Sequence, residues 1–365
     1  MARALITGGA GFIGSSFVRH LLRRRTGLSV VVLDKLTYAG NPDNLREFEG
    51  DPRYRFVRGD IADAAMVDAL FSEGLDLVFN FAAESHVDRS IHAPDAFLRT
   101  DVYGAYTLLE AARRRPVGRF IQISTDEVYG SVASGACSED SPLRPSSPYA
   151  ASKAAADGLV HAYWVTYGVP AIVTRATNNY GPRQYPEKII PLFVTNALDG
   201  LPLPLYGDGQ NVRDWLHVED HCAALLCVAE GGEVGGIYNL GGGNERANVD
   251  VARRILAALG LPRSLIRPVA DRPGHDRRYA LDCARARDLG WRPRVSFEAG
   301  LEATIAWYRD NRAWWEPLKS GAAAAYFRRQ YGASFMAGPS APPHRAASGS
   351  RRPPRRPSPR RPLAG

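Results

Sequence analysis

The first half of the chain alternates short apolar runs with stretches that have the spacing of amphipathic helices. Apolar runs occupy residues 4–7, 29–33, 55–57, 75–81 and 119–124. Between the first two, residues 12–25 place Phe17, Leu21 and Leu22 on one side of a helix. Near-continuous apolar strands separated by helices are typical of a parallel sheet covered on both faces. The pattern therefore predicts an α/β fold with a doubly wound parallel sheet.

The pattern changes after about residue 175, where prolines and glycines become frequent, as in residues 201–209. We expect a smaller α/β C-terminal substrate domain that covers the carboxyl edge of the sheet, where such sheets bind ligands. An amphipathic helix is predicted at residues 297–307, with Ser296 as its N-cap. The predicted domains are residues 1–175 plus about 215–240, which return as a helix and a strand, then 176–214 with 241–330, and a tail at 337–365.

The composition is that of a globular protein large enough for one large core or two linked cores. Of its 365 residues, 45% are hydrophobic and 23% are charged. The net charge of +8 belongs to the tail, because residues 337–365 contain seven arginines and no acid, and without them the charge is +1. The Arg-Pro composition of the tail predicts disorder. Nucleic-acid binding is therefore not expected, and a non-specific contact of the tail with RNA is the alternative.

Nothing in the sequence indicates secretion or membrane insertion. The first residues run directly into a strand-like segment, and no apolar run approaches the ~20 residues that span a bilayer. The four cysteines form no Cys-x-x-Cys pair, so disulfides are not expected and all four are predicted to be small buried side chains. They are Cys137, Cys222, Cys227 and Cys283. The prediction is a cytoplasmic protein without a metal site.

A glycine-rich turn carries the signature of a dinucleotide site. Gly8, Gly11 and Gly14 lie between a predicted strand and a helix, where missing Cβ atoms let the backbone approach a pyrophosphate at the positive helix N-terminus. Asp34 ends the second strand, and a carboxylate there binds ribose hydroxyls and repels a 2′-phosphate. The motif predicts a Rossmann domain that binds NAD rather than NADP. After the third strand, Asp60 and Ile61 are candidate adenine contacts, with a helix cap as the alternative for Asp60.

Tyr149 and Lys153 fall on one face of a predicted helix whose first turn contains Pro148. A phenol with a pKa near 10 is a poor base at neutral pH. A nearby ammonium and a positively charged nicotinamide are predicted to lower this pKa, and Lys153 can also bind the nicotinamide ribose. Thr125, at the end of the fifth strand, can donate a hydrogen bond to an alcohol or ketone. These three residues predict alcohol oxidation.

Asp126 and Glu127 follow directly, and a simple alcohol dehydrogenase does not need them. Loss of water beside an activated C–H bond requires one base and one acid. Two carboxyls in different environments can divide these roles. The alternative is a pair of solvated loop acids or helix caps. We therefore predict that the protein oxidises its substrate and then carries out proton chemistry on the product.

Taken together, the motifs resemble those of the dTDP-glucose 4,6-dehydratases of the extended short-chain dehydrogenase/reductase family. The resemblance covers residues 1 to about 330. A related epimerase would carry a Ser-Ala-Thr type run at Asp126 and Glu127, and a related decarboxylase or GDP-mannose dehydratase would usually have Ser at Asp126. The matching strings are Thr-Gly-Gly-Ala-Gly-Phe-Ile-Gly at 7–14, Asp-Lys-Leu-Thr-Tyr-Ala-Gly-Asn at 34–41, Ala-Ala-Glu-Ser-His-Val-Asp-Arg-Ser at 82–90, Ser-Thr-Asp-Glu-Val-Tyr-Gly at 124–130, Asn-Asn-Tyr-Gly-Pro-Arg-Gln at 178–184, Pro-Glu-Lys-Ile-Ile-Pro at 186–191, Gly-Asp-Gly-Gln-Asn-Val-Arg-Asp-Trp at 207–215 and Arg-Pro-Gly-His-Asp-Arg-Arg-Tyr at 272–279.

The resemblance implies a role for each reactive residue. Tyr149 takes the proton of the sugar C4 hydroxyl while NAD takes the hydride, with Thr125 and Lys153 assisting. Glu127 then removes the C5 proton and Asp126 protonates the departing C6 hydroxyl. The hydride returns to C6, and C5 is reprotonated. The implied product is a 4-keto-6-deoxy sugar nucleotide, and the implied assembly is a homodimer formed through a helix bundle.

The resemblance also implies two sets of binding residues. The cofactor set adds Phe12, Ile13, Lys35, Leu36, Thr37, Ala82, Ala83, Thr100 and Asn179 to the residues above. The set for dTDP-glucose is Ser85, Thr125, Asn178, Lys188, Ile189, Pro204, Leu205, Tyr206, Arg213, Asn248, Arg272 and His275. A UDP-glucose 4,6-dehydratase stays open, because nothing separates thymine from uracil. So does a non-catalytic dinucleotide-binding regulator, although such proteins usually lose the Tyr-Lys pair or the acids.

Overall fold

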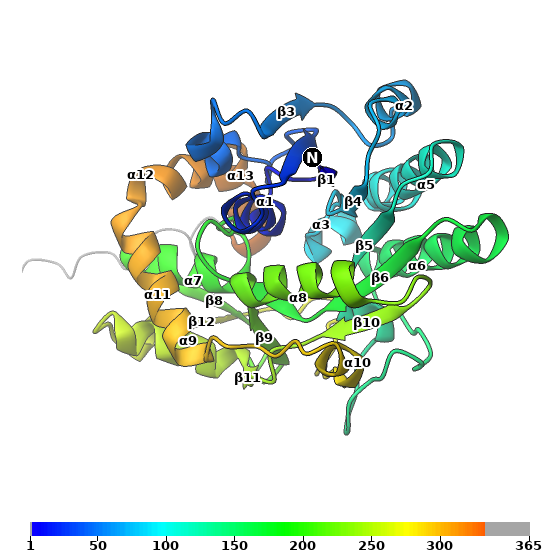
Figure 1. The fold of residues 1–365 in the computed structure, drawn as a ribbon. Coiled ribbons are helices and arrows are strands. Elements are labelled where there is room, and N and C mark those ends of the chain that lie inside the picture. Colours follow the sequence, from blue (N-terminus) through cyan, green and yellow to red (C-terminus); the bar gives the residue numbers. More distant parts are fainter. Residues whose placement is uncertain (1, 333–365) are drawn as a thin grey trace, which may run out of the picture.

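The computed structural model describes residues 2–332, so the predicted tail at 337–365 lies outside the described residues. Its main sheet has seven strands, all parallel, in the order β10-β6-β5-β4-β1-β2-β3 (Figure 1). They are β1 (Ala2–Thr7), β2 (Leu28–Asp34), β3 (Tyr54–Arg58), β4 (Leu77–Asn80), β5 (Arg119–Thr125), β6 (Ala171–Ala176) and β10 (Ile237–Leu240). The order reverses beside β1, and ligands bind at such switch points. The predicted doubly wound α/β class is confirmed.

Helices cover both faces of this sheet, and alternate residues of β1 supply the two cores. Ala4 and Ile6 pack with α1 and α8, whereas Leu5 packs with α2, α5 and α6. The strand β4 is shorter than the predicted run 75–81, and Phe81, which follows it, lines a pocket. The helical segments of this part are α1 (Phe12–Arg24), η1 (Pro42–Phe48), α2 (Ala64–Ser72), α3 (Val87–His92), α4 (Pro94–Phe97), the π-helix η2 (Leu98–Gly104), α5 (Ala105–Arg114), η3 (Asp126–Tyr129), α6 (Pro148–Tyr167) and α8 (Val218–Gly231).

A second lobe lies beyond the carboxyl ends of the strands. Its core contains Tyr180, Trp215 and Phe297, and two small sheets have the orders β11-β9-β7 and β12-β8. The strands are β7 (Asn178–Tyr180), β8 (Leu203–Tyr206), β9 (Val212–His217), β11 (Glu245–Ala247) and β12 (Ile266–Val269). The helical segments are α7 (Ile189–Leu198), α9 (Asn248–Ala258), η4 (Arg263–Leu265), α11 (Phe297–Asp310), α12 (Arg312–Trp315), η5 (Pro317–Lys319) and α13 (Gly321–Tyr331). The short helix α10 (Ala284–Asp288) packs against β10 of the main sheet instead.

Local signals in the sequence account for several helix starts. Ser296 accepts a hydrogen bond from the N–H of Ala299, which confirms it as the N-cap of α11. Ser147 caps α6 in the same way, and Pro148 occupies the first turn as predicted. Residues 215–240 contain α8 and β10, and β10 is an edge strand of the main sheet. The exact domain boundaries stay a prediction.

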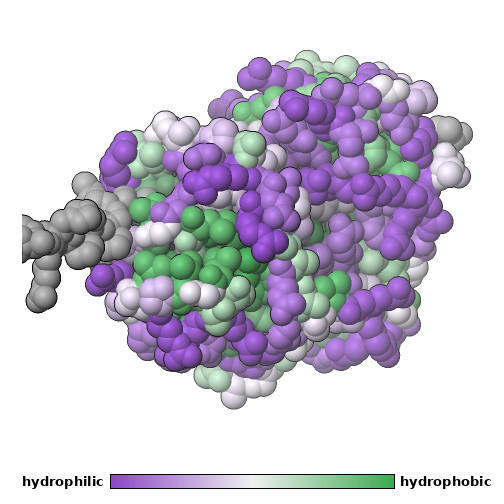
Figure 2. Space-filling view, turned by 90° about the vertical axis from the view of Figure 1, so that its left-hand side faces the viewer, coloured by the Kyte–Doolittle hydropathy of each residue, from purple (hydrophilic) through white to green (hydrophobic). Residues whose placement is uncertain are grey.

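The surface on the side of α11 and α12 is mixed. In Figure 2 hydrophobic residues gather in one area of this face, bordered by hydrophilic residues on the remaining surface. Within residues 2–332, no helix is both long and apolar enough to cross a membrane. Cys222 and Cys283 are buried as predicted, whereas Cys137 and Cys227 are only half-buried, and all four are free thiols.

Candidate active site

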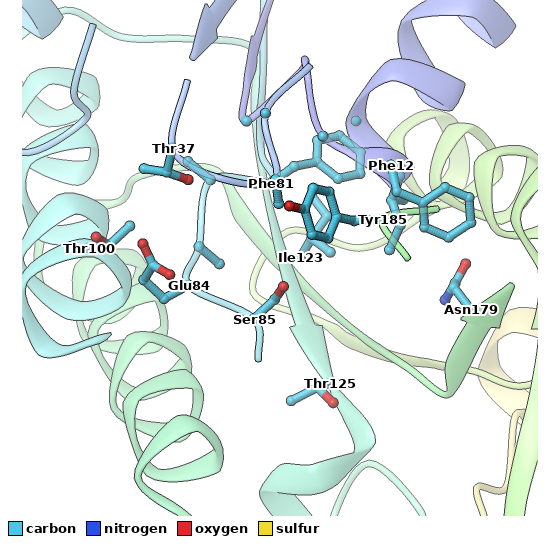
Figure 3. A pocket seen from close by; sticks show the side chains of 18 of the residues that line it. Phe12, Thr37, Phe81, Glu84, Ser85, Thr100, Ile123, Thr125, Asn179 and Tyr185 are labelled. Carbon is cyan, nitrogen blue, oxygen red and sulfur yellow. The ribbon is translucent and has the colours of Figure 1, made fainter. Parts of the chain in front are cut away.

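A pocket lies at the carboxyl ends of the main strands and extends beneath the second lobe. Figure 3 shows Phe12, Thr37 and Thr100 from the Rossmann lobe on its wall, together with Asn179 from the second lobe. Sixteen of the seventeen predicted cofactor residues line it: Gly8, Gly11, Phe12, Ile13, Gly14, Asp34, Lys35, Thr37, Asp60, Ile61, Ala82, Ala83, Thr100, Tyr149, Lys153 and Asn179. The exception is Leu36, which has a φ of 58° and donates its N–H to Asp34 at 2.8 Å.

The glycine-rich turn has the shape that a dinucleotide requires. Gly8 has a φ of 63°, and a Cβ there would lie 2.7 Å from the nitrogen of Ala82. A Cβ on Gly14 would lie 2.4 Å from the carbonyl oxygen of Gly8. Gly11 is the N-cap of α1 and offers no side-chain cap, so the first N–H groups of this helix can face a pyrophosphate. The residues present therefore fit NAD.

Asp34 sits at the end of β2 with its carboxylate held in place. One oxygen accepts the N–H of Ala10 at 2.9 Å and the other accepts the N–H of Leu36. Burial raises the pKa of Asp34, and these two hydrogen bonds oppose that rise. Gly40 is needed beside it, because a Cβ there would lie 2.8 Å from Oδ1. Each oxygen keeps a lone pair for a ribose hydroxyl.

Asp60 resolves the alternative left open by the sequence. Its Oδ2 lies 2.7 Å from Nζ of Lys35, and its Oδ1 accepts the N–H of Ala62. The N-cap of α2 is Asp63 instead, which accepts the N–H groups of Ala65 and Met66. Asp60 therefore stands on the pocket wall and is not the cap of α2.

The reactive residues come from two elements, the end of β5 with η3 and the first turns of α6. Thr125 Oγ1 donates to Oδ1 of Asp126 at 3.2 Å and accepts the N–H of Glu127 at 3.3 Å. Lys153 Nζ donates to the carbonyl oxygen of Ile123 on β5 at 2.6 Å. Tyr149, on the same helix, lines the same pocket as Thr125. The structure thus brings all five predicted catalytic residues to one pocket wall.

The two carboxyls have different surroundings. Asp126 is only 3% exposed, and burial followed by the neighbouring charge of Glu127 raises its pKa well above the usual range. Its Oδ2 is buried without a hydrogen-bond partner. Burial also raises the pKa of Glu127, but Arg272, Arg213 and Lys188 oppose the rise. Asp126 is therefore the better proton donor, and Glu127 is the better carboxylate base.

The prediction that Lys153 and the nicotinamide together lower the pKa of Tyr149 stays a prediction, and the chain's own groups act in the opposite direction. Burial raises this pKa well above 10, and the carboxyls of Glu127 and Asp101 raise it further. The hydrogen bond of Lys153 to the backbone of β5 directs this ammonium at a carbonyl oxygen. A hydrogen bond with Thr125 acts in the other direction and lowers the pKa of Tyr149.

The predicted dTDP-glucose residues divide into two groups. Ser85, Thr125, Asn178 and Lys188 line the pocket, whereas Ile189, Pro204, Leu205, Tyr206, Arg213, Asn248, Arg272 and His275 do not. Leu205 packs in the core of the second lobe, so only its backbone is available to a ligand. Arg272 forms an ion pair with Asp88 at 2.9 Å, and the hydroxyl of Tyr206 donates to the same carboxylate. His275 contacts Asp271 at 2.6 Å, and Asn248 Oδ1 is buried without a partner.

The sequence did not identify several polar residues of the pocket wall. They include Glu84, Thr177, Gln184, Glu187 and His221. Both ring nitrogens of His221 are buried without partners, and burial lowers its pKa to about 3, so the ring is neutral. Thr177 follows β6 at the carboxyl edge of the sheet, which is a usable signal. His221 lies within a buried helix, and its spacing does not distinguish it from a core residue. Within residues 2–332, no group of three His, Cys, Asp or Glu residues could hold a metal ion.

Comparison with known proteins assigns the chain to a family. A family model described as GDP-mannose 4,6 dehydratase matches residues 5–304. A dTDP-glucose 4,6-dehydratase from Streptomyces antibioticus is 54% identical over 345 residues, which cover 93% of this chain and 98% of the relative. The crystal structure of DesIV, a dTDP-glucose 4,6-dehydratase from Streptomyces venezuelae with NAD bound, is 55% identical and has a TM-score of 0.85 over 87% of this chain and 100% of that chain.

A more distant structure shows how far the fold is shared. A UDP-glucose 4-epimerase from Thermus thermophilus in complex with NAD is 35% identical, with a TM-score of 0.78 over 85% of this chain and 99% of that chain. The fold alone therefore does not separate dehydratases from epimerases, and the residues at the end of β5 must do so. The chain belongs to the family of nucleotide-sugar dehydratases that the GDP-mannose 4,6-dehydratase model describes, and within it to the dTDP-glucose 4,6-dehydratases that its motifs resemble.

Proposed function

We propose that the chain dehydrates dTDP-glucose to dTDP-4-keto-6-deoxyglucose with NAD as its cofactor. The observation that carries this proposal is the pair Asp126 and Glu127 in the pocket that Tyr149 also lines. Their unequal surroundings provide one acid and one base, which water elimination requires and simple oxidation does not. The relatives from Streptomyces antibioticus and Streptomyces niveus are named dTDP-glucose 4,6-dehydratases.

The first task of the site is to activate the C4 hydroxyl. Bound NAD supplies the redox chemistry, in which it accepts the C4 hydride and later returns it to C6. Tyr149 must be ionised to receive the proton of the C4 hydroxyl. The positive nicotinamide of bound NAD would stabilise this phenolate, and the hydrogen bond with Thr125, which lowers the pKa of the phenol, supports the same charge. Lys153 holds the carbonyl of Ile123 and thereby fixes α6 against β5. The 4-keto group formed in this way acidifies the neighbouring C5–H bond.

The second task is elimination across C5 and C6. Glu127 takes the C5 proton and returns it to C5 when C6 receives the hydride. The cations Arg272, Arg213 and Lys188 favour its ionised form beforehand. Asp126 donates its proton to the departing C6 hydroxyl, which leaves as water. Its unpartnered Oδ2 is the atom available for this donation. The same three cations are suited to the diphosphate of the nucleotide.

The direct test is an incubation of the purified protein with dTDP-glucose, UDP-glucose and GDP-mannose in parallel. We expect loss of one water from dTDP-glucose and a 4-keto-6-deoxy product by mass spectrometry and NMR, with much slower conversion of the other two. A product of unchanged mass, such as a C4 epimer, would overturn the proposed activity. Faster conversion of UDP-glucose would retain the dehydratase chemistry but replace the nucleotide.

We further propose that two copies associate through the face of α5 and α6, which lie side by side in Figure 1. Five of the seven exposed large apolar side chains among residues 2–332 lie on these helices or on η2 before them: Leu98, Tyr103, Tyr106, Val165 and Tyr167. Such a patch on a soluble fold is typical of an association surface. A self-complementary face on a helix pair fits a second copy of the chain.

Charge introduced on this face should separate the copies. We expect the double substitution Tyr106→Lys with Val165→Lys, which places like charges on both helices, to yield a monomer in sedimentation velocity, whereas the wild type sediments as a dimer. Val234→Lys is the matched control, because Val234 is also exposed, at 39%, but lies outside the α5–α6 face. A wild-type monomer, or a dimer that survives the double substitution, would contradict the proposed interface.

A further inference from the structure

The side chain of Glu187 lies at the pocket wall but has no part in the chemistry above. It is only 1% exposed, and its carboxylate contacts two other segments of the chain. The hydroxyl of Tyr38 donates to Oε1 at 2.7 Å, and Nε of Arg89 donates to Oε2 at 3.4 Å. His86 also approaches Oε2, at 3.9 Å, but burial lowers the pKa of this histidine to about 4, so it is neutral. Arg89 is therefore the cation that donates a hydrogen bond to this buried carboxylate, and the charge of Lys188 also acts on it.

Aromatic contacts strengthen this arrangement, which we call the Glu187 cluster and define as Tyr38, Arg89 and Glu187. The guanidinium of Arg89 lies over the ring of Tyr38 at 3.8 Å and over the ring of Tyr326 of α13 at 4.7 Å. Stacking of this kind fixes the guanidinium plane. The cluster is thus closed: each member contacts both of the others.

The three members of the Glu187 cluster belong to three segments that line different parts of the pocket. Tyr38 follows Lys35 and Thr37, which line the cofactor end of the pocket. Arg89 follows the segment 82–85, whose residues line the pocket next to the cofactor and the sugar. Glu187 precedes Lys188, whose ammonium donates to the carbonyl oxygen of Ser85. The cluster therefore joins the wall of the cofactor site to two residues of the predicted nucleotide-sugar site.

A buried carboxylate requires its partners more strongly than an exposed one. Removing one partner leaves part of the charge uncompensated in a region that excludes water. The position of each segment consequently depends on the other two. A cofactor that orders residues 35–37 would also order Tyr38, and through Glu187 it would fix the backbone that carries Lys188.

We propose that Glu187 is a positioning residue that couples the ordering of the NAD site to the placement of Lys188 at the nucleotide-sugar site. This inference rests on the proposed function, because it assigns Lys188 to the nucleotide sugar. Glu187 touches no reacting atom in this scheme. Its effect should therefore appear in ligand affinity and in the coupling between the two ligands, and much less in the chemical step.

The test uses Tyr38→Phe, Glu187→Gln and their combination. Tyr38→Phe removes one hydroxyl and keeps the ring under Arg89, so it retains the aromatic contact if Glu187→Gln should fail to fold. The matched control is Tyr163→Phe, since the hydroxyl of Tyr163 also donates to a carboxylate, Glu110, at 2.7 Å but lies outside the pocket. The measurements are kcat and KM for dTDP-glucose, the dissociation constant of NAD, and that of dTDP with and without NAD.

We expect Tyr38→Phe and Glu187→Gln each to raise KM and both dissociation constants about tenfold, the scale of one hydrogen bond to a charged group. The kcat should stay within about twofold, and dTDP should no longer bind more tightly in the presence of NAD. The double variant should match Glu187→Gln alone, because both changes break one unit. Tyr163→Phe should behave as wild type.

Two results would overturn the inference. One is an unchanged KM and unchanged ligand coupling in both single variants, even with lowered thermal stability. The other is a loss of kcat at constant KM, which would place Glu187 in the chemical step. Failure of the wild type to convert dTDP-glucose would count against the proposed function instead, and the dTDP and NAD titrations would still test the coupling.

Discussion

Replacement of Asp126 by asparagine will slow formation of the 4-keto-6-deoxy product by about 10²–10⁴-fold, the contribution of a positioned general acid. The amide keeps the shape of the side chain and can still accept the hydrogen bond of Thr125. It has no proton to give to the departing C6 hydroxyl. Oxidation at C4 depends on Tyr149 and Thr125 and should continue. Reduced cofactor should therefore accumulate on the enzyme and be visible by its absorbance near 340 nm.

A substrate without a C6 hydroxyl separates the effect of Asp126→Asn on water loss from any effect on C4 oxidation. With dTDP-6-deoxyglucose, which has no C6 hydroxyl to lose, the variant and the wild type should oxidise C4 at similar rates. The Glu127→Gln variant should differ, because it cannot remove the C5 proton, and exchange of that proton with deuterated water should stop. Unimpaired dehydration by Asp126→Asn would remove Asp126 from its assigned role.

The same assignment predicts a pH dependence with a definite sign. Burial and the charge of Glu127 hold the pKa of Asp126 well above its usual range, so it keeps its proton at pH values where ordinary aspartates have lost theirs. Activity should fall on the alkaline side, as pH rises through this raised pKa and the acid is lost. The residual dehydration of Asp126→Asn should lack this decline.

The parts of the molecule that follow from local sequence were predictable. The strands have recognisable apolar patterns, and the glycine turn has a recognisable motif. Ser147, Pro148 and Ser296 are helix-start signals whose hydrogen bonds and backbone preferences involve only the next few residues of the chain. Asp34 was predictable because its distance from the glycines fixes its place at the end of β2. Local patterns thus identified the glycines, Asp34 and the residues after the third strand on this pocket wall, whereas most of the other cofactor residues were predicted from the family resemblance.

The missed features depend on residues that are distant in sequence. The high pKa of Tyr149 arises from burial and from Glu127 and Asp101, which no local pattern places beside it. Glu187 meets Tyr38 across 149 positions of the chain, and its motif gave no sign of that contact. Hydrophobic periodicity reports which face of an element is buried, but it does not report which polar groups meet inside the fold.

A buried ion pair beneath η3 gives the largest expected effect on stability. Arg175 of β6 and Asp157 of α6 meet at 2.9 Å, with side chains only 4% and 3% exposed. The same guanidinium donates to the hydroxyl of Tyr129 at 2.8 Å, and Tyr129 donates to Asn239. Tyr129 is the last residue of η3, the short helix that contains both catalytic acids. The pair therefore supports the fold and the position of those acids.

Replacement of Asp157 by alanine should lower the free energy of unfolding by about 3–5 kcal/mol, because it leaves the charge of Arg175 buried and unpaired. Chemical denaturation followed by circular dichroism measures this change. Asp140→Asn is the matched control, since Asp140 pairs with Arg285 at 2.6 Å but is 80% exposed. An exposed pair contributes about 0–1 kcal/mol, so the control should unfold close to the wild type.

A double substitution separates the contribution of the Asp157–Arg175 pair to stability from its contribution to the position of the catalytic acids. Asp157→Leu with Arg175→Met replaces both charges with apolar side chains, and such replacements recover most of the stability lost in the single variant. They do not restore the hydrogen bond to Tyr129, so η3 should remain less well fixed. We therefore expect a double variant of nearly wild-type stability whose kcat is at least tenfold lower, measured on dTDP-glucose. A double variant with normal kcat would show that Arg175 serves the fold alone, and that packing of Tyr129 is enough to hold Asp126 and Glu127 in place.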